Sequence, residues 1–234
     1  MLSLCVVDPQ IDPTVAEEFA QAQRVCYQEF AAEAAVTEVS PEELASNRVL
    51  YVVARDGGPR GDIVGGLRLH FSHAPGTSLP VERVLTRLSQ LGRMLESRRD
   101  QGIAEVCGFW IFSQYRGTGL SGALVRAGVA AMPMHSAHLA IALSHHYVVS
   151  HWAPIGFQAD ARLGVHPYPD ARYFSKVILL DPIRLTTSEP DQRRKILALR
   201  HALRHHWPIF WSPERGEQVL VQPAELESWV SAAQ

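Results

Sequence analysis

The segment from residue 104 to residue 131 constrains the fold more than any other part of the sequence. It begins with AEVCGFWIF (104–112), a nearly continuous apolar run typical of a strand that is covered on both faces. A short turn with Gly117 and Gly119 follows, and then a set of apolar residues at helical spacing. These residues are Leu120, Ala123, Leu124, Ala127 and Ala131. The segment predicts a buried strand, a glycine loop and a helix beginning at residue 120.

Glycines at the start of a helix have a specific use. The first N–H groups of a helix lack intrahelical partners and lie at the positive end of the helix dipole. They can bind a phosphate where no Cβ blocks its approach, and Gly117 and Gly119 provide that clearance. An ordinary strand-to-helix turn explains the same glycines equally well at this point.

Two nucleotide-binding motifs are excluded for this loop. The glycines are too few and too close for a Walker loop, and no Lys-Ser/Thr pair follows them. GTGLSG (117–122) has dinucleotide-type spacing, but the next strand candidate, HLAIALS (138–144), does not end in an acidic residue. The pattern that does fit is Gln/Arg-x-x-Gly-x-Gly/Ala, from Gln114 to Gly119.

This hexapeptide resembles the acyl-CoA-binding loop of the GNAT superfamily of N-acyltransferases. The surrounding elements resemble that family in order and spacing: an early hairpin over 49–71, then HLAIALS and HHYVVSHWAPIGF (145–157). The resemblance covers roughly residues 13–181. It implies an α/β (α+β) fold of the GNAT type, with a mixed, twisted central sheet flanked by helices.

The resemblance also implies a donor site for acetyl-CoA or another acyl-CoA. In the family, the loop amides hold the pyrophosphate, and the fourth strand binds the pantetheine arm and supplies an oxyanion N–H. Gly108 fits a bulge that splays this strand. The residues assigned to the donor are Ile111, Phe112, Gln114, Tyr115, Arg116, Gly117, Thr118, Gly119 and Leu120.

Two residues are candidates for proton transfer. An attacking amine must lose a proton, and Glu105, at the start of an apolar strand, is the candidate base because burial would raise its pKa. A strand-end carboxylate in solvent, or a counter-ion for an ammonium group, remains the alternative. Many family members protonate the thiolate with a tyrosine that is Trp152 here, so His151 becomes the candidate acid, with pocket lining as its alternative.

Residues 72–103 form an insertion where compact acetyltransferases have a tight turn. The apolar residues predict one amphipathic helix with Arg83, Arg87, Arg93, Arg98 and Arg99 on its polar side. It is either a solvated decoration or a wall over the pocket. The layout is similar to N-acyl amino acid synthases and acyl-homoserine-lactone synthases, which use fatty acyl donors, often on acyl carrier protein. Those families commonly follow the strand glutamate with Ser-Arg, whereas Val106 and Cys107 stand here.

Composition and organisation set wider bounds. The 234 residues, 47% of them hydrophobic, suffice for one large core, and a net charge of −2 gives no reason to expect nucleic acid. The three cysteines favour a reducing compartment, and we expect a cytoplasmic protein with no signal peptide and no membrane span. We expect an acyltransferase domain over 1–181 and a helical extension over 182–234. Trp207, Trp211 and Trp229 predict that the extension packs on the core or on a second subunit of a homodimer.

The sequence thus predicts an N-acyltransferase that moves an acyl group, acetyl by default, from acyl-CoA to a primary amine. Long-chain synthesis from acyl carrier protein is the first alternative. A non-catalytic acyl-CoA sensor and an interaction module acting through the tail are the others. His201 and His205 lie four apart on a predicted helix, yet no metal site is expected.

Overall fold

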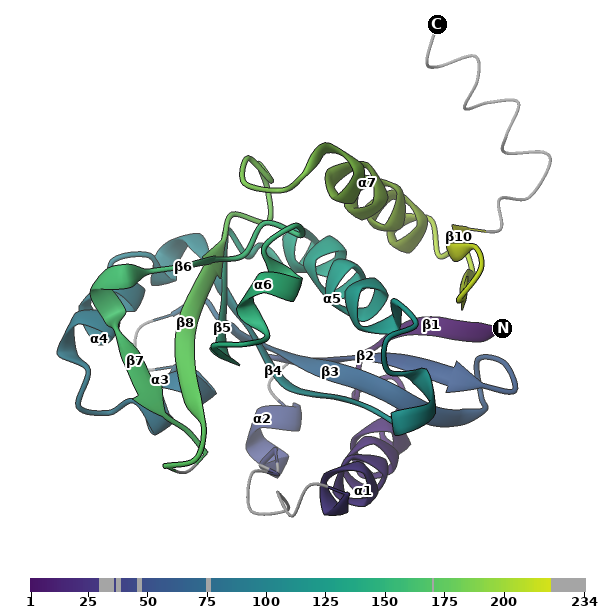
Figure 1. Ribbon diagram of the computed structural model, residues 1–234, viewed down its shortest axis with the longest axis horizontal. Coiled ribbons are helices and arrows are strands. Elements are labelled where there is room, and N and C mark those ends of the chain that lie inside the picture. The colour runs from purple at the N-terminus through teal and green to yellow at the C-terminus, as the bar shows by residue number, and fades with distance from the viewer. Residues whose placement is uncertain (30–35, 37–38, 46–47, 75–76, 170, 220–234) are drawn as a thin grey trace, which may run out of the picture.

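A computed structural model describes residues 1–219 except 30–35, 37–38, 46–47, 75–76 and 170. Within these residues one mixed sheet has the order β10-β9-β1-β2-β3-β4-β5-β8-β6, and β7 pairs with β8 (Figure 1). The strands are β1 (Leu2–Val7), β2 (Val49–Asp56), β3 (Asp62–Ser72), β4 (Ile103–Ile111), β5 (Leu139–His145), β6 (Gln158–Ala159), β7 (Val165–Pro167), β8 (Phe174–Leu180), β9 (Ile209–Ser212) and β10 (Gly216–Val219). The helices are α1 (Thr14–Gln28), α2 (Pro41–Ala45), α3 (Pro80–Val84), α4 (Ser89–Glu96), α5 (Leu120–Ala131), α6 (Val149–Trp152) and α7 (Pro190–Arg204).

The predicted strand–loop–helix segment occupies the centre of this sheet. β4 is antiparallel to β3 and parallel to β5, and both of its faces are covered, which explains its continuous apolar sequence. The hairpin predicted over 49–71 is β2 and β3, and the helix predicted from residue 120 is α5. The predicted fold class, a mixed sheet flanked by helices, is confirmed.

The helices cover both faces of the sheet, and the two faces differ. α5 lies on one face with α7 packed against it, and α1 lies on the other (Figure 1). The face under α5 carries one large apolar cluster. The opposite face carries two smaller clusters, one beneath α1 and one beneath α3 and α4. The cavity described below lies where these two clusters meet.

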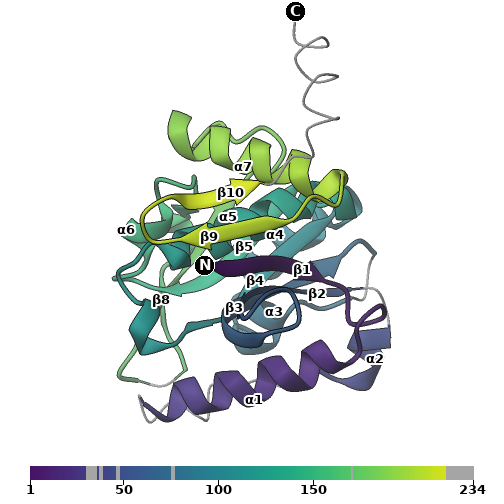
Figure 2. The same ribbon diagram turned by 90° about the vertical axis from the view of Figure 1, so that its right-hand side faces the viewer.

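The ends of the chain join the sheet in a way that the sequence analysis missed. β1 was not predicted, and it pairs with β2 on one side and with β9 on the other. Figure 2 shows β9 and β10 continuing the sheet beyond β1, with α7 above them. The tail within residues 182–219 is therefore a helix and a hairpin. The predicted strand over 218–222 lies only partly within the described residues, and the final helix over 223–233, with Trp229, lies outside them.

The tail is fixed to α5 by a buried ion pair. Arg126 on α5 contacts Glu217 on β10, and its guanidinium also donates a 2.7 Å hydrogen bond to Gln192 on α7. Trp211 is only 2% exposed. These contacts place the described part of the tail on the core of the same chain.

The prediction of one amphipathic helix in the insertion was wrong. The segment forms α3 and α4, because the backbone leaves helical geometry between Leu85 and Leu88. Its apolar residues still share one cluster against the sheet. Arg99, predicted on the polar side, is buried and paired with Glu82 and Glu96.

Candidate active site

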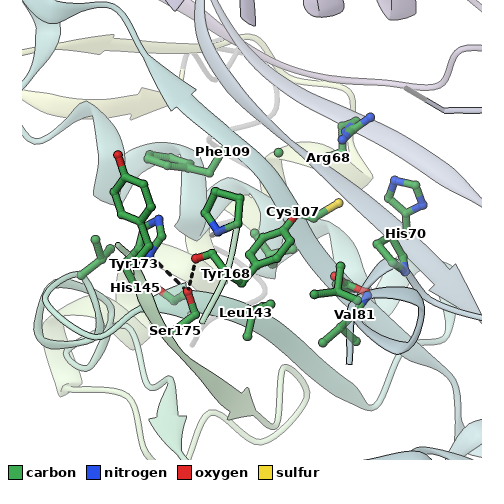
Figure 3. A pocket seen from close by; sticks show the side chains of 18 of the residues that line it. Arg68, His70, Val81, Cys107, Phe109, Leu143, His145, Tyr168, Tyr173 and Ser175 are labelled. Carbon is green, nitrogen blue, oxygen red and sulfur yellow. Dashed lines mark hydrogen bonds between the residues drawn. The ribbon is translucent and has the colours of Figure 1, made fainter. Parts of the chain in front are cut away.

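The central feature of the site is a fork between β4 and β5. The two parallel strands pair only from Ile103 to Val106 on β4, although β4 continues to Ile111. β5 continues to His145 alongside β8 instead. A cavity of about 610 Å³ opens in the fork, lined by these strands, β3, α3 and the segment before β8 (Figure 3).

A β-bulge bends β4 away from β5. Between Cys107 and Trp110 the register with β3 shifts, so Gly108 and Phe109 together stand opposite a single residue. Gly108 has a φ of +60°, which disfavours any residue with a Cβ. This confirms the bulge predicted there. Because Gly108 has no side chain, the bulge presents backbone to the cavity.

Helix α1 holds the bulge from the face of the sheet that also carries the cavity. The side chain of Gln23, which is 1% exposed, donates a 3.0 Å hydrogen bond to the carbonyl of Gly108. The hydroxyl of Tyr27 donates a 3.2 Å bond to the carbonyl of Phe109. These two bonds satisfy carbonyls that the bulge removes from the sheet ladder. Sequence analysis did not identify Gln23 or Tyr27 as site residues, because only the fold brings α1 to the bulge.

A buried polar stripe crosses the sheet between the two smaller apolar clusters. Arg68 pairs with Cys107 and His70 with Glu105 in the β3–β4 register, so the four side chains share one face. All four line the cavity. The guanidinium of Arg68 also lies 6.0 Å from the ring centre of Phe19. A polar stripe in a sheet interior is costly unless it serves a ligand or a network.

Glu105 is the buried carboxyl group of this stripe. It is 3% exposed and accepts a 2.9 Å hydrogen bond from the backbone N–H of Val81. Burial raises its pKa to about 8, and the Val81 bond only partly offsets this effect. The alternative of a solvated strand end is therefore excluded. Since Val81 belongs to α3, the insertion forms a wall of the cavity and contacts the candidate base directly.

The neighbours of Glu105 in the stripe include two neutral groups at physiological pH. Burial and the charge of Arg68 lower the pKa of His70 to about 3, so the imidazole is uncharged. Burial raises the pKa of Cys107 to about 12, so the thiol keeps its proton. Arg68 is therefore the cation of a stripe whose other groups are a protonated thiol, a carboxyl and a neutral imidazole.

The β5 side of the fork carries a histidine with a defined tautomer. His145 ends β5, and its Nδ1 lies 3.2 Å from Ser175 Oγ (Figure 3). Ser175 Oγ also contacts the Tyr168 carbonyl at 3.1 Å, and a carbonyl only accepts. The single hydroxyl hydrogen therefore goes to Tyr168, and the proton of the neutral ring lies on Nδ1. Sequence analysis did not identify His145 as a proton-transfer candidate, because Ser175 is thirty residues away in sequence.

The candidate acid His151 does not reach the cavity. Its side chain is exposed and is not among the residues that line it. Trp152, the neighbour of His151, is 4% exposed, does line the cavity and packs edge-on against Phe109. The structure thus gives no geometric support to His151 as the acid.

The glycine loop lies at the N-terminus of α5. Gly117 and Gly119 have φ values of +74° and +95°, and a Cβ on either would meet no atom within 4 Å. Within the described part of the chain, the N–H groups of residues 117–122 donate no hydrogen bond to protein atoms. A cluster of outward amides of this kind suits an anion.

The remaining loop residues have structural contacts. Arg116 extends to α1 and pairs with Glu29 at 2.9 Å, while Thr118 Oγ1 donates a 2.6 Å bond to the carbonyl of Tyr115. Gln114 is exposed. Leu120 and Ile111 are buried in the core.

The structure does not support Phe112 as an oxyanion donor. Its N–H donates a 3.1 Å bond to the carbonyl of Val64 on β3. Neither Ile111 nor Phe112 lines the cavity, whereas the bulge residues do.

Within the described part of the chain, the histidines at the end of α7 do not form part of a metal site. His201 and His205 do face one another, with ring centres 4.4 Å apart. Among the described residues, however, no group of three histidine, cysteine or acidic side chains is placed to hold a metal ion. None of the described helices is long and apolar enough to cross a bilayer.

The chain has sequence relatives among known proteins. No family model matches the chain. Uncharacterised proteins of Mycobacterium tuberculosis and Mycobacterium bovis are 28% identical over 199 residues, covering 83% of this chain and 74% of theirs.

Several solved structures have a fold similar to that of this chain. The CoA-dependent acyl-homoserine lactone synthase BjaI, solved with SAM and isopentyl-CoA, superposes with a TM-score of 0.59 at 16% identity, covering 84% of this chain and 90% of its own. FeeM, an N-acyl amino acid synthase from uncultured soil microbes, has a TM-score of 0.57 at 13% identity, covering 83% and 99%. The forked sheet, the bulged fourth strand and these similarities together show that this chain has the GNAT fold, in a form shared with acyl-homoserine lactone and N-acyl amino acid synthases.

Proposed function

We propose that this protein is an N-acyltransferase that moves an acyl group from an acyl-CoA to a primary amine by direct attack on the thioester. The observation that carries the proposal is the cavity in the β4–β5 fork, combined with the open glycine loop where β4 leads into α5. A carrier bound along β4 would have its diphosphate at the loop and its thioester at the bulge. Donor binding would then occupy the loop that follows β4, and chemistry would occur at the bulge within β4.

The residues of the cavity suit aminolysis of a thioester. The incoming amine must give up a proton, and Glu105 with a pKa of about 8 is a strong enough base when ionised. The backbone of Gly108, fixed by Gln23, faces the cavity where the oxyanion of the tetrahedral intermediate would form. The thiolate leaves tolerably without a strong acid, because the pKa of a thiol is about 8.5.

The donor is best tested with a loop variant and a matched control. Acetyl-CoA, longer acyl-CoAs and acyl carrier protein conjugates are titrated against the wild type, Gly119→Glu and Gly164→Glu by calorimetry. Both glycines have positive φ and open space around them, so both variants carry the same strain and charge, but Gly164 lies far from the loop in sequence.

We expect wild type and Gly164→Glu to bind an acyl-CoA and Gly119→Glu to lose at least about 100-fold in affinity, because a carboxylate would occupy the anion site. Equal binding by the two variants, or binding by none of the three proteins, would contradict the donor site. Release of free thiol with a panel of amines then separates a transferase from a protein that only senses acyl-CoA.

A second candidate function is synthesis of long-chain N-acyl amides from acyl carrier protein. The observation in its favour is that α3 of the insertion walls the cavity, with Val81 and Val84 facing it. A cavity of about 610 Å³ is also far larger than an acetyl group requires. Faster thiol release from octanoyl carriers than from acetyl-CoA would favour this candidate, and the reverse would favour the acetyltransferase.

A further inference from the structure

A proton-transfer group faces the bulge from the other arm of the fork. The last β4–β5 pair is Val106 with Ala142, and continuing that register by three residues sets His145 across from Phe109. His145 and Phe109 both line the cavity. Glu105 lies four register positions from His145, which is about 13 Å along a strand, at the closed end of the fork. By residue count His145 stands on the β5 arm of the fork at the level of the bulge, whereas Glu105 lies at the closed end of the fork.

The hydrogen-bond network leaves one nitrogen of His145 open to a ligand. Nδ1 carries its proton towards Ser175, whose hydroxyl is anchored by the Tyr168 carbonyl. Nε2 has no hydrogen-bond partner within the described residues, so its lone pair can accept a proton. The ring lies at the end of β5, Ser175 lies on β8 and Tyr168 lies in the segment before β8, so the tautomer is set by the fold.

The surroundings of the ring keep it neutral. Tyr147 stacks on it with ring centres 5.5 Å apart, and Tyr173 packs against it at 5.0 Å. Arg172 lies over the ring of Tyr173, and His146 follows in the chain. Burial, assisted by the charge of His146, lowers the pKa of His145. Near neutral pH the ring is therefore an uncharged acceptor.

We propose that His145 is a catalytic residue that carries the proton from the attacking amine to the departing thiolate, a role that rests on the proposed acyl transfer. Glu105 first takes one proton from the incoming ammonium. The neutral nitrogen then forms the C–N bond to the thioester carbon and gives one N–H proton to Nε2. The C–S bond breaks with its electron pair on sulfur, and the imidazolium returns the proton to that thiolate. The products are an amide and free CoA thiol, and the ring ends as it began.

This assignment supplies the general acid that Trp152 cannot provide. An indole N–H donates a hydrogen bond but does not give up its proton near neutral pH, so Trp152 cannot replace the family tyrosine as an acid. Ser175 acts through His145 and is a positioning residue. His146, by contrast, is exposed and absent from the cavity lining.

The test compares His145→Asn with His146→Asn. The amide introduced at position 145 can still donate towards Ser175, but it has no basic nitrogen. With the acyl-CoA and amine that release thiol fastest in the wild type, we expect His145→Asn to lose about 100-fold in kcat with an unchanged KM for acyl-CoA. The fall of kcat below the pKa of the ring, where the imidazole becomes protonated, should disappear with it. His146→Asn should keep the wild-type kcat near neutral pH, and its fall of kcat at low pH should move only slightly upward, because the charge of His146 no longer lowers the pKa of His145.

A second measurement distinguishes a catalytic role of His145 from a folding defect in the variant. Two-dimensional ¹H–¹⁵N spectra of histidine-labelled wild type should show His145 with its proton on Nδ1, and Ser175→Ala should mix the tautomers and lower kcat by less than His145→Asn. Wild-type kcat in His145→Asn, or an Nε2–H tautomer, would overturn the proposal and leave the transferase intact. Donor binding without thiol release from any amine would overturn the transferase proposal together with the role of His145, whereas wild-type kcat in His145→Asn would overturn the role of His145 alone.

Discussion

The glycine loop and the cavity in the β4–β5 fork are built in opposite ways. The loop comprises six consecutive residues, is mostly exposed and offers backbone amides; its specificity comes from the absence of Cβ atoms at Gly117 and Gly119. The cavity draws on β3, β4, β5, β8, α1 and α3, and its chemistry comes from buried side chains. Local sequence suffices to build a turn of outward-facing amides, while tuned acid–base groups require low-dielectric surroundings that only distant segments supply.

This difference predicts separate kinetic effects. Changes in the loop should alter donor affinity, and changes in the cavity should alter the rate of the chemical step. A loop variant that lowers kcat with a normal KM would contradict this assignment. So would a cavity variant that raises KM with a normal kcat.

The largest effect is expected from Glu105→Gln. The variant keeps the shape and an acceptor for the Val81 N–H but cannot take a proton, so kcat should fall by about 10² to 10⁴. In the wild type, kcat should rise with pH towards about 8 as Glu105 ionises, and the variant should lack that rise. Glu214→Gln, which removes an exposed carboxylate, is the control. A pH profile unchanged in Glu105→Gln would exclude Glu105 as the base.

The same substitution has a consequence for stability. The pKa of Glu105 is higher in the folded chain than its ordinary value of 4.5, so the folded state holds the proton more tightly than the unfolded state. The free energy of unfolding should therefore fall as pH rises from about 4.5 to about 8, by up to about 1.4 kcal/mol per pH unit. Urea titrations at several pH values should show that Glu105→Gln lacks this component.

A smaller effect is expected in the loop from Gly117→Ala. A Cβ meets no neighbour there, but a φ of +74° costs a non-glycine residue about 1–2 kcal/mol. If the loop relaxes, the amides lose their alignment, and KM for acyl-CoA should rise by about tenfold with kcat unchanged. Gly58→Ala, in the β2–β3 turn with φ of +96° and equally open surroundings, should leave KM unaltered. Equal shifts in both variants would attribute the effect to general strain.

The smallest effect is expected from Gln23→Met. This change in α1 tests whether the bulge at Gly108 belongs functionally with the cavity or with the glycine loop. The variant leaves the Gly108 carbonyl without its donor, so the free energy of unfolding should drop by about 1–3 kcal/mol and kcat by a few-fold. Gln21→Met, on the exposed side of α1, should change neither. If Gln23→Met alters KM but not kcat, then the bulge serves donor binding.

Sequence patterns predicted the parts of this protein that depend on neighbouring residues. The buried strand, the glycine turn and the helix of residues 104–131 follow from apolar spacing, and the bulge at Gly108 follows from a glycine inside a strand. The sequence leaves the burial of Glu105 open, because a carboxylate near the start of a strand can lie in solvent or in the core, and the structure places it in the core.

Longer-range features escaped prediction for a physical reason. β1 and β9 are short strands whose pairing depends on each other, and the break between α3 and α4 depends on how the insertion settles on the sheet. His151 looked suitable by its place in the chain, yet the turn of α6 directs it to solvent.

By itself, the sequence determined a buried strand, a glycine turn and an apolar helix in that order, because hydrophobic periodicity and glycine geometry act over a few residues. Only the tertiary structure decided which side chains meet in the fork: Gln23 with the bulge, Val81 with Glu105, and Ser175 with His145. Hydrogen bonds and desolvation depend on contact in space, and contact between segments far apart in the chain leaves no periodic trace in the sequence.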